Sequence, residues 1–139
     1  MSYLLDTNVV SETERERPDN NVLKWLERTD PGITFLSALT IGEVKKGVSK
    51  LPTGKKKAHI QNWLENVRQK FDGRILPITE HTFLVWGKML AEFEKKGIVR
   101  SVLDSFLEAT ALEHDLILVT RNVRNFKDTA ITILNPWEE

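Results

Sequence analysis

Apolar residues along this chain follow two periods, and together they predict alternating strands and helices. Short apolar runs are typical of buried strands, and they lie at 3–5, 33–36, 75–78, 116–119 and 131–134. Longer segments with apolar residues three and four positions apart predict amphipathic helices. The predicted helices span residues 21–29, 40–51, 58–71, 79–96 and 102–114. Segment 11–21 is expected to form a short helix followed by a loop. Pro77 weakens the third strand, since proline cannot donate to a sheet.

Strands separated by helices favour parallel pairing through crossover connections. The expected fold is therefore α/β, a three-layer α/β/α arrangement around a mainly parallel sheet. A length of 139 residues without a linker or an internal repeat suits one domain, residues 1–139. Ligands bind outside the carboxyl ends of strands in open parallel sheets, and that rule draws attention to Asp6 and to residues 120–122.

Composition narrows the possible classes of function. Twenty Lys and Arg balance twenty Asp and Glu, so the chain has no overall positive charge to draw it onto nucleic acid. A local rim of basic side chains around an acidic site is still compatible with this balance, and its candidates are Lys45, Lys46 and Lys50. The absence of cysteine excludes disulfides, zinc-thiolate sites and thiol catalysis. No apolar run reaches the roughly 18 residues that span a bilayer, and Asp6 interrupts any signal-like core, so a cytoplasmic protein without membrane contact is expected.

Three acids are candidates for chemistry, and each also has a structural interpretation. Asp6 ends a buried strand, where it either caps the following turn or helix or carries a partly desolvated charge. Glu43 is either a functional carboxylate or the capping-box partner of Thr40. Asp104 is either functional or a first-turn acid that the helix dipole favours. If the three converge, their oxygens suit Mg²⁺ or Mn²⁺, which acidify a bound water and neutralise a phosphodiester.

The ordered set of these segments resembles the PIN-domain ribonucleases, in particular the VapC and FitB toxins of prokaryotic toxin–antitoxin pairs. The resemblance covers essentially the whole chain. The matching segments are Leu5-Asp6-Thr7-Asn8-Val9, Leu36 to Glu43, Asp104 with Ala109-Thr110-Ala111, Val119-Thr120-Arg121-Asn122, Gly73 to Pro77 and Asn135-Pro136-Trp137.

The resemblance implies that Asp6, Glu43 and Asp104 line a site for Mg²⁺ or Mn²⁺, with Asp6 and Asp104 as its direct ligands. A second group of side chains, which orient the carboxylates around that site, comprises Thr7, Asn8, Ser37 and Thr120.

The family usually has a fourth acid, directly after Thr120-Arg121 or three residues later. This chain has amides there, Asn122 and Asn125, so weaker metal binding is expected. Glu108, one turn after Asp104, either compensates or lies on the surface. Arg121 is a candidate phosphate contact, and the alternative is a surface or ion-paired arginine.

The function implied is a metal-dependent endoribonuclease, the toxin of a type II toxin–antitoxin system, which hydrolyses RNA with a metal-activated water. Its expected partners are RNA, a cognate antitoxin and a second copy of the chain, which assemble into a higher complex, and the helix of Trp86 is the candidate dimer contact. One alternative is a PIN-like binding or regulatory protein of weakened catalysis. Another is a phosphatase with Asp6 as nucleophile, which Asn8 disfavours because such sites need an acid at that position.

Overall fold

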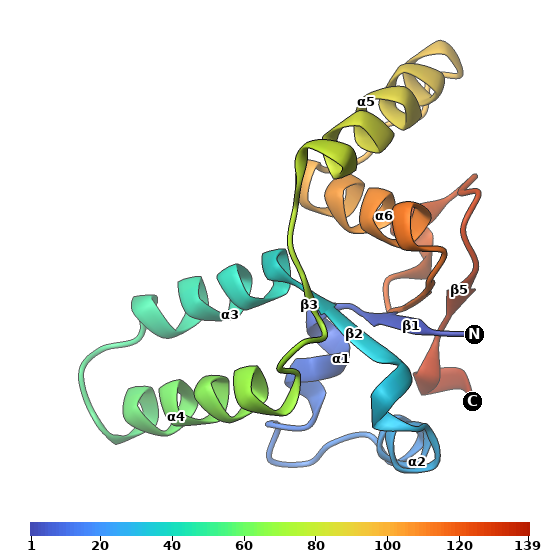
Figure 1. The fold of residues 1–139 in the computed structure, drawn as a ribbon. Helices are drawn as coiled ribbons and strands as arrows, with labels where there is room; N and C mark the ends of the chain where they lie inside the picture. Colours follow the sequence, from blue (N-terminus) through green and yellow to red (C-terminus); the bar gives the residue numbers. More distant parts are fainter.

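The computed structural model describes residues 1–139 and alternates strands with helices along the chain (Figure 1). The strands are β1 (Tyr3–Leu5), β2 (Thr34–Ser37), β3 (Ile75–Leu76), β4 (Ile117–Val119) and β5 (Ile133–Leu134). The helices are α1 (Thr7–Glu12), α2 (Asn20–Arg28), α3 (Ala38–Lys50), α4 (Lys55–Lys70), α5 (Glu80–Lys95) and α6 (Val102–His114). Short 3-10 turns are η1 (Pro31–Ile33), η2 (Val123–Phe126) and η3 (Pro136–Glu138). None of the helices is both long and apolar enough to cross a membrane.

The five strands form one parallel sheet in the order β3-β2-β1-β4-β5. The central strand β1 pairs on both sides, with Tyr3 opposite Thr34 of β2 and Ile117 of β4. Every crossover contains at least one helix or 3-10 turn, which is what parallel pairing requires. The predicted parallel α/β/α architecture is therefore confirmed.

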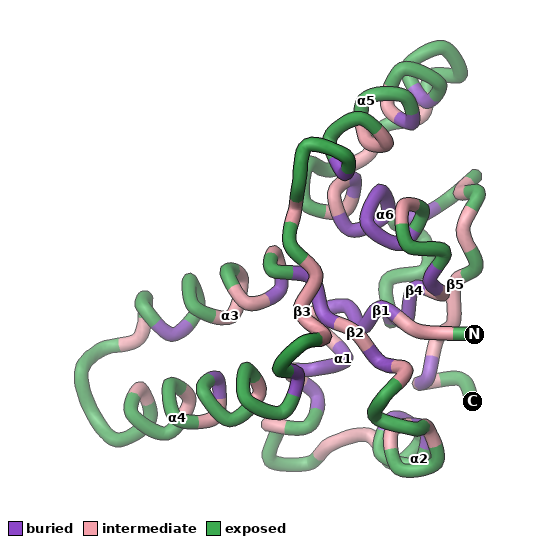
Figure 2. Tube along the Cα trace, in the orientation of Figure 1, coloured by how far each residue is buried: buried purple, intermediate pink, exposed green.

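The side chains of neighbouring residues in β1 point to opposite faces of the sheet, because side chains alternate along a strand. Leu5 packs with residues of α1 and α2, including Val9 and Trp25. Leu4 faces the other way and packs with Leu107 of α6 and its neighbours. The buried parts of the chain accordingly lie along the sheet and on the helix faces toward it, whereas the ends of α3, α4 and α5 project outward and are exposed (Figure 2).

Two predicted helix boundaries are wrong, and capping explains both. The first helix begins at Thr7 rather than near Ser11, because the Asp6 side chain accepts a hydrogen bond from the Thr7 N–H and caps it. The helix expected from Thr40 begins at Ala38, where Ser37 caps it through the N–H of Leu39. Thr40 is buried within this helix, so the proposed capping box of Thr40 with Glu43 does not exist.

The remaining elements agree with the predicted ones to within a few residues. The Thr79 side chain caps α5 as expected, and α6 has the predicted bounds. The third strand, β3, ends at Leu76, directly before Pro77. The aromatic rings of Trp86 and Phe106 stack with centroids 5.0 Å apart, which joins α5 to α6.

Candidate active site

Asp6 follows the central strand directly and is held by hydrogen bonds to both carboxylate oxygens. Oδ1 accepts from the Thr7 N–H at 2.7 Å, and Oδ2 accepts from the Thr120 hydroxyl at 2.7 Å. Only 8% of the residue is exposed. The capping interpretation of Asp6 is correct, and the same geometry fixes a largely buried carboxylate at the carboxyl edge of the sheet, where ligands of such folds bind.

Glu43 reaches the same edge from α3. Its Oε1 accepts a 2.9 Å hydrogen bond from the Thr7 hydroxyl, while the Thr7 backbone binds Asp6. A single residue of α1 therefore links two carboxylates that lie far apart in the sequence. Thr40, one turn earlier on α3, lies 3.4 Å from the same hydroxyl.

Asp104 lies in the first turn of α6, where its N–H donates to the Ser101 side chain that caps the helix. Its negative charge, like that of Glu43, acts on Asp6. Burial raises the pKa of Asp6, the hydrogen bonds from Thr120 and Thr7 lower it, and the charges of Glu43 and Asp104 raise it again, so that the net pKa is above its ordinary value. The structure thus brings the three predicted acids into one electrostatic neighbourhood.

The carboxylates of Asp6, Glu43 and Asp104 form no ion pair with Lys, Arg or His. No group of three or more His, Asp or Glu side chains is arranged to hold a metal ion by itself. Mg²⁺ usually keeps several waters and binds one or two carboxylates together with substrate phosphates. Carboxylates without a positive partner therefore suit a hydrated Mg²⁺ that keeps part of its water shell. They do not suit a metal that is enclosed entirely by protein ligands.

The second group of predicted residues divides into those that contact a carboxylate and one that does not. The Asn8 amide lies 3.4 Å from Asp6 Oδ2 and 3.3 Å from the Thr120 hydroxyl. Thr7 and Thr120 bind the carboxylates as described above. Ser37 instead uses its side chain to cap α3 and has no hydrogen bond to an acid, so it positions Glu43 only by fixing where that helix begins.

Glu108 is neither a surface residue nor a free acid. It is 1% exposed and pairs with Arg100, whose Nε donates to Glu108 Oε1 at 2.7 Å. Its other oxygen accepts from the hydroxyl of Thr129. The prediction of a surface position is therefore wrong, and the carboxylate is already compensated. The sequence carries no local signal for this pair, because only the path of the loop before α6 brings Arg100 to Glu108.

The two residues at the family's fourth acid position lie in different surroundings. The N–H of Asn122 donates to the Thr120 hydroxyl, which in turn binds Asp6. Asn125 is exposed and lines an open polar hollow of about 650 Å³ together with Asp104. Neither amide adds negative charge to the site.

Arg121, the candidate phosphate contact, is exposed and forms no ion pair. Its guanidinium lies 5.3 Å from the centroid of the Trp137 ring, over the carboxyl-terminal turn η3. Its N–H lies 3.4 Å from Asn8 Oδ1. The surface interpretation therefore describes its position, and stacking on Trp137 holds its charge in place.

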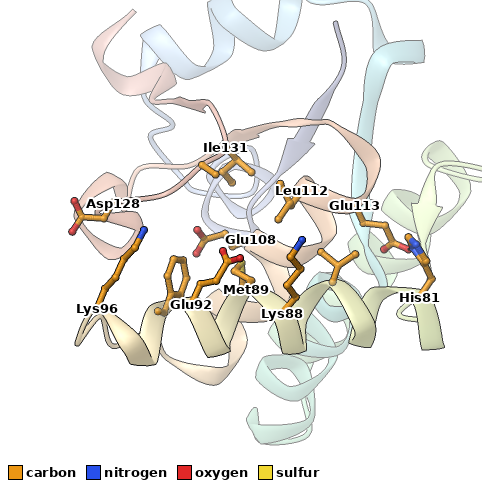
Figure 3. Close-up of a pocket in the computed structure, with 13 residues that line it drawn as sticks. His81, Lys88, Met89, Glu92, Lys96, Glu108, Leu112, Glu113, Asp128 and Ile131 are labelled. Carbon is orange, nitrogen blue, oxygen red and sulfur yellow. The ribbon is translucent and has the colours of Figure 1, made fainter.

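A second hollow, of about 410 Å³, lies between α5, α6 and the segment before β5 (Figure 3). Apolar side chains such as Met89 and Leu112 share its walls with charged ones. It contains none of the three acids of the site. This hollow is smaller than the one that Asp104 lines and is separate from the candidate active site.

Known proteins resemble this chain over nearly its full length. The sequence model of the PIN domain family matches residues 3–131. A VapC ribonuclease of Sinorhizobium fredii is 34% identical over 136 residues, 97% of this chain and 97% of that protein. The toxin FitB of Neisseria gonorrhoeae is 34% identical over 137 residues, 98% of this chain and 99% of its own. The crystal structure of FitAcB from the same organism superposes with a TM-score of 0.93 at 34% identity and covers 99% of each chain.

Proposed function

The chain belongs to the PIN domain family, and on that basis we propose that it is a divalent-metal-dependent endoribonuclease that hydrolyses RNA phosphodiester bonds. The observations that carry the proposal are that Thr7 hydrogen-bonds both Asp6 and Glu43, that the charge of Asp104 acts on Asp6, and that none of the three acids has a positive partner. Unpaired carboxylates of this kind are costly unless a cation accompanies them. The names of the related proteins support ribonuclease activity in particular.

Asp6 and Asp104 are the proposed direct ligands of Mg²⁺ or Mn²⁺, and Glu43 completes the acidic lining. When bound, the cation supplies Lewis-acid chemistry, which acidifies water and neutralises charge on the phosphodiester. The chain's own residues prepare the site. Thr120 and the Thr7 N–H fix the two oxygens of Asp6, and the Thr7 hydroxyl fixes Glu43, so little reorganisation is needed when substrate binds.

The proposal includes the role of a toxin neutralised by a cognate antitoxin. Solved relatives are toxin–antitoxin complexes, among them FitAB bound to a DNA fragment, with a TM-score of 0.92 and 33% identity. In this chain, a shallow apolar groove of about 110 Å³ lies between α1, α2 and α4. Val9 and Val10 of α1 contribute to it, and an apolar side chain of the antitoxin is the proposed occupant.

The same proposal includes a homodimer through α5. Phe83 and Leu84 of this helix are 49% and 65% exposed, and Leu103 at the start of α6 is 46% exposed. Exposed apolar side chains on neighbouring helices favour contact with another protein surface. Light scattering of the purified chain, with Leu84→Glu as the variant, measures whether this face forms a dimer.

RNA cleavage tests the enzymatic proposal. Purified protein is incubated with structured RNA and Mn²⁺ or Mg²⁺, with and without EDTA, beside an Asp6→Asn variant. Cleavage that requires the metal and is lost in the variant supports the proposal. Identical RNA patterns in all reactions would contradict it.

A second function has one observation in its favour. Asn122 and Asn125 replace the fourth acid, and no three acids form a complete metal cluster. A PIN-like protein that binds its partner without cutting RNA is consistent with both facts. The same assay separates the two functions, because a binding protein gives no metal-dependent products.

A further inference from the structure

Four basic side chains line the hollow that contains Asp104, and Arg124 and Lys127 are two of them. Its walls are the carboxyl end of α5, the loop into α6 and the turn η2, and Arg124 and Lys127 come from η2 and the residue that follows it. Both side chains are exposed, and neither forms an ion pair. Asn125 lies between them in the sequence and lines the same hollow.

The segment that carries these two cations is firmly anchored. Arg100 Nη2 donates to the backbone carbonyl of Lys127 at 2.6 Å, and its Nε donates to the buried Glu108. Its guanidinium also lies 4.6 Å from the centroid of the Phe93 ring. Arg100 also lines the hollow, but its charge is committed to Glu108. Its role is to hold the Lys127 backbone in place, which presents Arg124 and Lys127 on an ordered wall.

The positive charges on this wall of the hollow do not favour binding of a metal cation by itself. Lys96 and Asp128 also line this hollow and together add no net formal charge to it, and both lie at the same end of the neighbouring hollow (Figure 3). Arg124 and Lys127 are then left beside Asp104. Two positive charges near a cation site weaken its affinity for the cation, whereas they strengthen its affinity for a polyanion.

We propose that Arg124 and Lys127 form a phosphate-binding track for single-stranded RNA that leads to Asp104. This inference rests on the proposed ribonuclease function and names how that site holds its substrate. The lining of the hollow contains no aromatic residue on which a base could stack. The track therefore binds the phosphates of the RNA backbone and contributes affinity without a preference for particular bases.

Binding of a fluorescent single-stranded RNA of mixed sequence, measured by anisotropy in EDTA, tests the track. EDTA prevents the proposed cleavage, and salt is varied from about 50 to 200 mM. The variant is Arg124→Ala with Lys127→Ala. The matched control is Lys55→Ala with Lys56→Ala, which removes the same charge from exposed positions on α4. Thermal melting confirms that each variant is folded, and the pair Arg124→Gln with Lys127→Gln repeats the test with side chains of greater length.

Loss of two phosphate contacts lowers the salt dependence of log Kd by about 1.4, since each contact to a single strand contributes about 0.7. Over the fourfold change in salt, the parent then loses about sevenfold more affinity than the variant. The control keeps the slope of the parent. A variant with the parent's slope would overturn the track, while metal-dependent cleavage by the parent would leave the ribonuclease proposal standing.

Two further outcomes separate the track from the proposed function. RNA binding that depends on Arg124 and Lys127 without cleavage in Mn²⁺ supports the track and contradicts the ribonuclease proposal. Absence of RNA binding by the parent overturns the track. An effect of the variant on duplex DNA alone, with RNA binding unchanged, also overturns it, because the wall would then serve a different nucleic acid.

Discussion

Thr7 donates a 2.9 Å hydrogen bond from its hydroxyl to Oε1 of Glu43, a residue 36 positions further along the chain. The N–H of Thr7 simultaneously binds Asp6 Oδ1 at 2.7 Å. One residue therefore orients two of the three acids, one through its backbone and the other through its side chain. The orientation of Glu43 is thereby tied to the start of α1.

Thr7→Val tests this link, because valine has nearly the same shape but no hydroxyl. We expect the free energy of unfolding to fall by about 1 kcal/mol and RNA cleavage to fall by about 10- to 100-fold. Chemical denaturation and initial cleavage rates measure the two effects. Thr53→Val, at an exposed position, is the control. Unchanged cleavage by Thr7→Val would show that the orientation of Glu43 is irrelevant to activity.

Asp6→Asn separates stability from activity. The neutral amide removes a buried negative charge that Glu43 and Asp104 repel, so we expect a higher Tm in metal-free buffer at neutral pH. Cleavage should fall at least about a hundredfold, since metal stabilisation of the transition state amounts to several kcal/mol. Mn²⁺ should raise the Tm of the parent and leave that of the variant nearly unchanged. An equal rise in both proteins would place the metal elsewhere.

The raised pKa of Asp6 also predicts how stability depends on pH without metal. The folded chain binds this proton more tightly than the unfolded chain, whose carboxyl has a pKa near 3.8. The contribution of Asp6 to stability is thus fully present below that value and is lost as the pH rises through the folded pKa. The difference in unfolding free energy between the parent and Asp6→Asn should therefore shift against the parent as the pH rises above about 4. Denaturation at several pH values measures it, and a shift in the opposite direction would contradict the prediction.

The buried pair of Arg100 and Glu108 should be more important for stability than any surface pair. Arg100→Met leaves Glu108 as an unpaired charge, and we expect a loss of about 3 to 5 kcal/mol. Arg68→Met breaks the exposed pair with Glu65 and should cost less than about 1 kcal/mol. In a double-mutant cycle, Arg100→Met with Glu108→Leu should cost less than the sum of the single changes. Additive costs would mean that the two side chains act independently.

Restoring an acid at the fourth position should strengthen metal binding. The backbone N–H of Asn122 binds the Thr120 hydroxyl, which binds Asp6, so Asn122→Asp adds negative charge to the segment that adjoins Asp6. We expect Mn²⁺ affinity, measured by calorimetry, to rise on the order of tenfold, which corresponds to about 1.4 kcal/mol. Asn125→Asp is the comparison, and its effect should be smaller because Arg124 and Lys127 flank it. The reverse order would identify Asn125 as the residue nearer the cation.

The fold was largely accessible from the sequence because its signals are local. The apolar run before Asp6 and the cap at Thr79 each predict an element that the structure contains. The start of α3 was less accessible. Both Ser37 and Thr40 have hydroxyls able to cap a helix, and the choice of Ser37 is set by where β2 ends, which is a tertiary contact.

The site was accessible only in part, for a related reason. Asp6, Glu43 and Asp104 follow from strand ends and from the family resemblance. Glu108 does not, because an acid on a helix is usually exposed, and only the path of the loop before α6 brings Arg100 to it. The proposed role of Arg124 and Lys127 has no signal in the sequence either, because it depends on the hollow that they share with Asp104, whereas the rim of Lys45, Lys46 and Lys50 stays a prediction.

The position of Asp6 has a consequence for biosynthesis. Its backbone N–H binds Val119 and its carboxylate binds Thr120, 114 residues away. Translation therefore delivers Asp6 long before the partners that hold it, because Thr120 is made 114 residues later. A nascent polypeptide that has not yet released Val119 and Thr120 from the ribosome lacks this anchorage, and so the proposed site cannot form before these residues emerge.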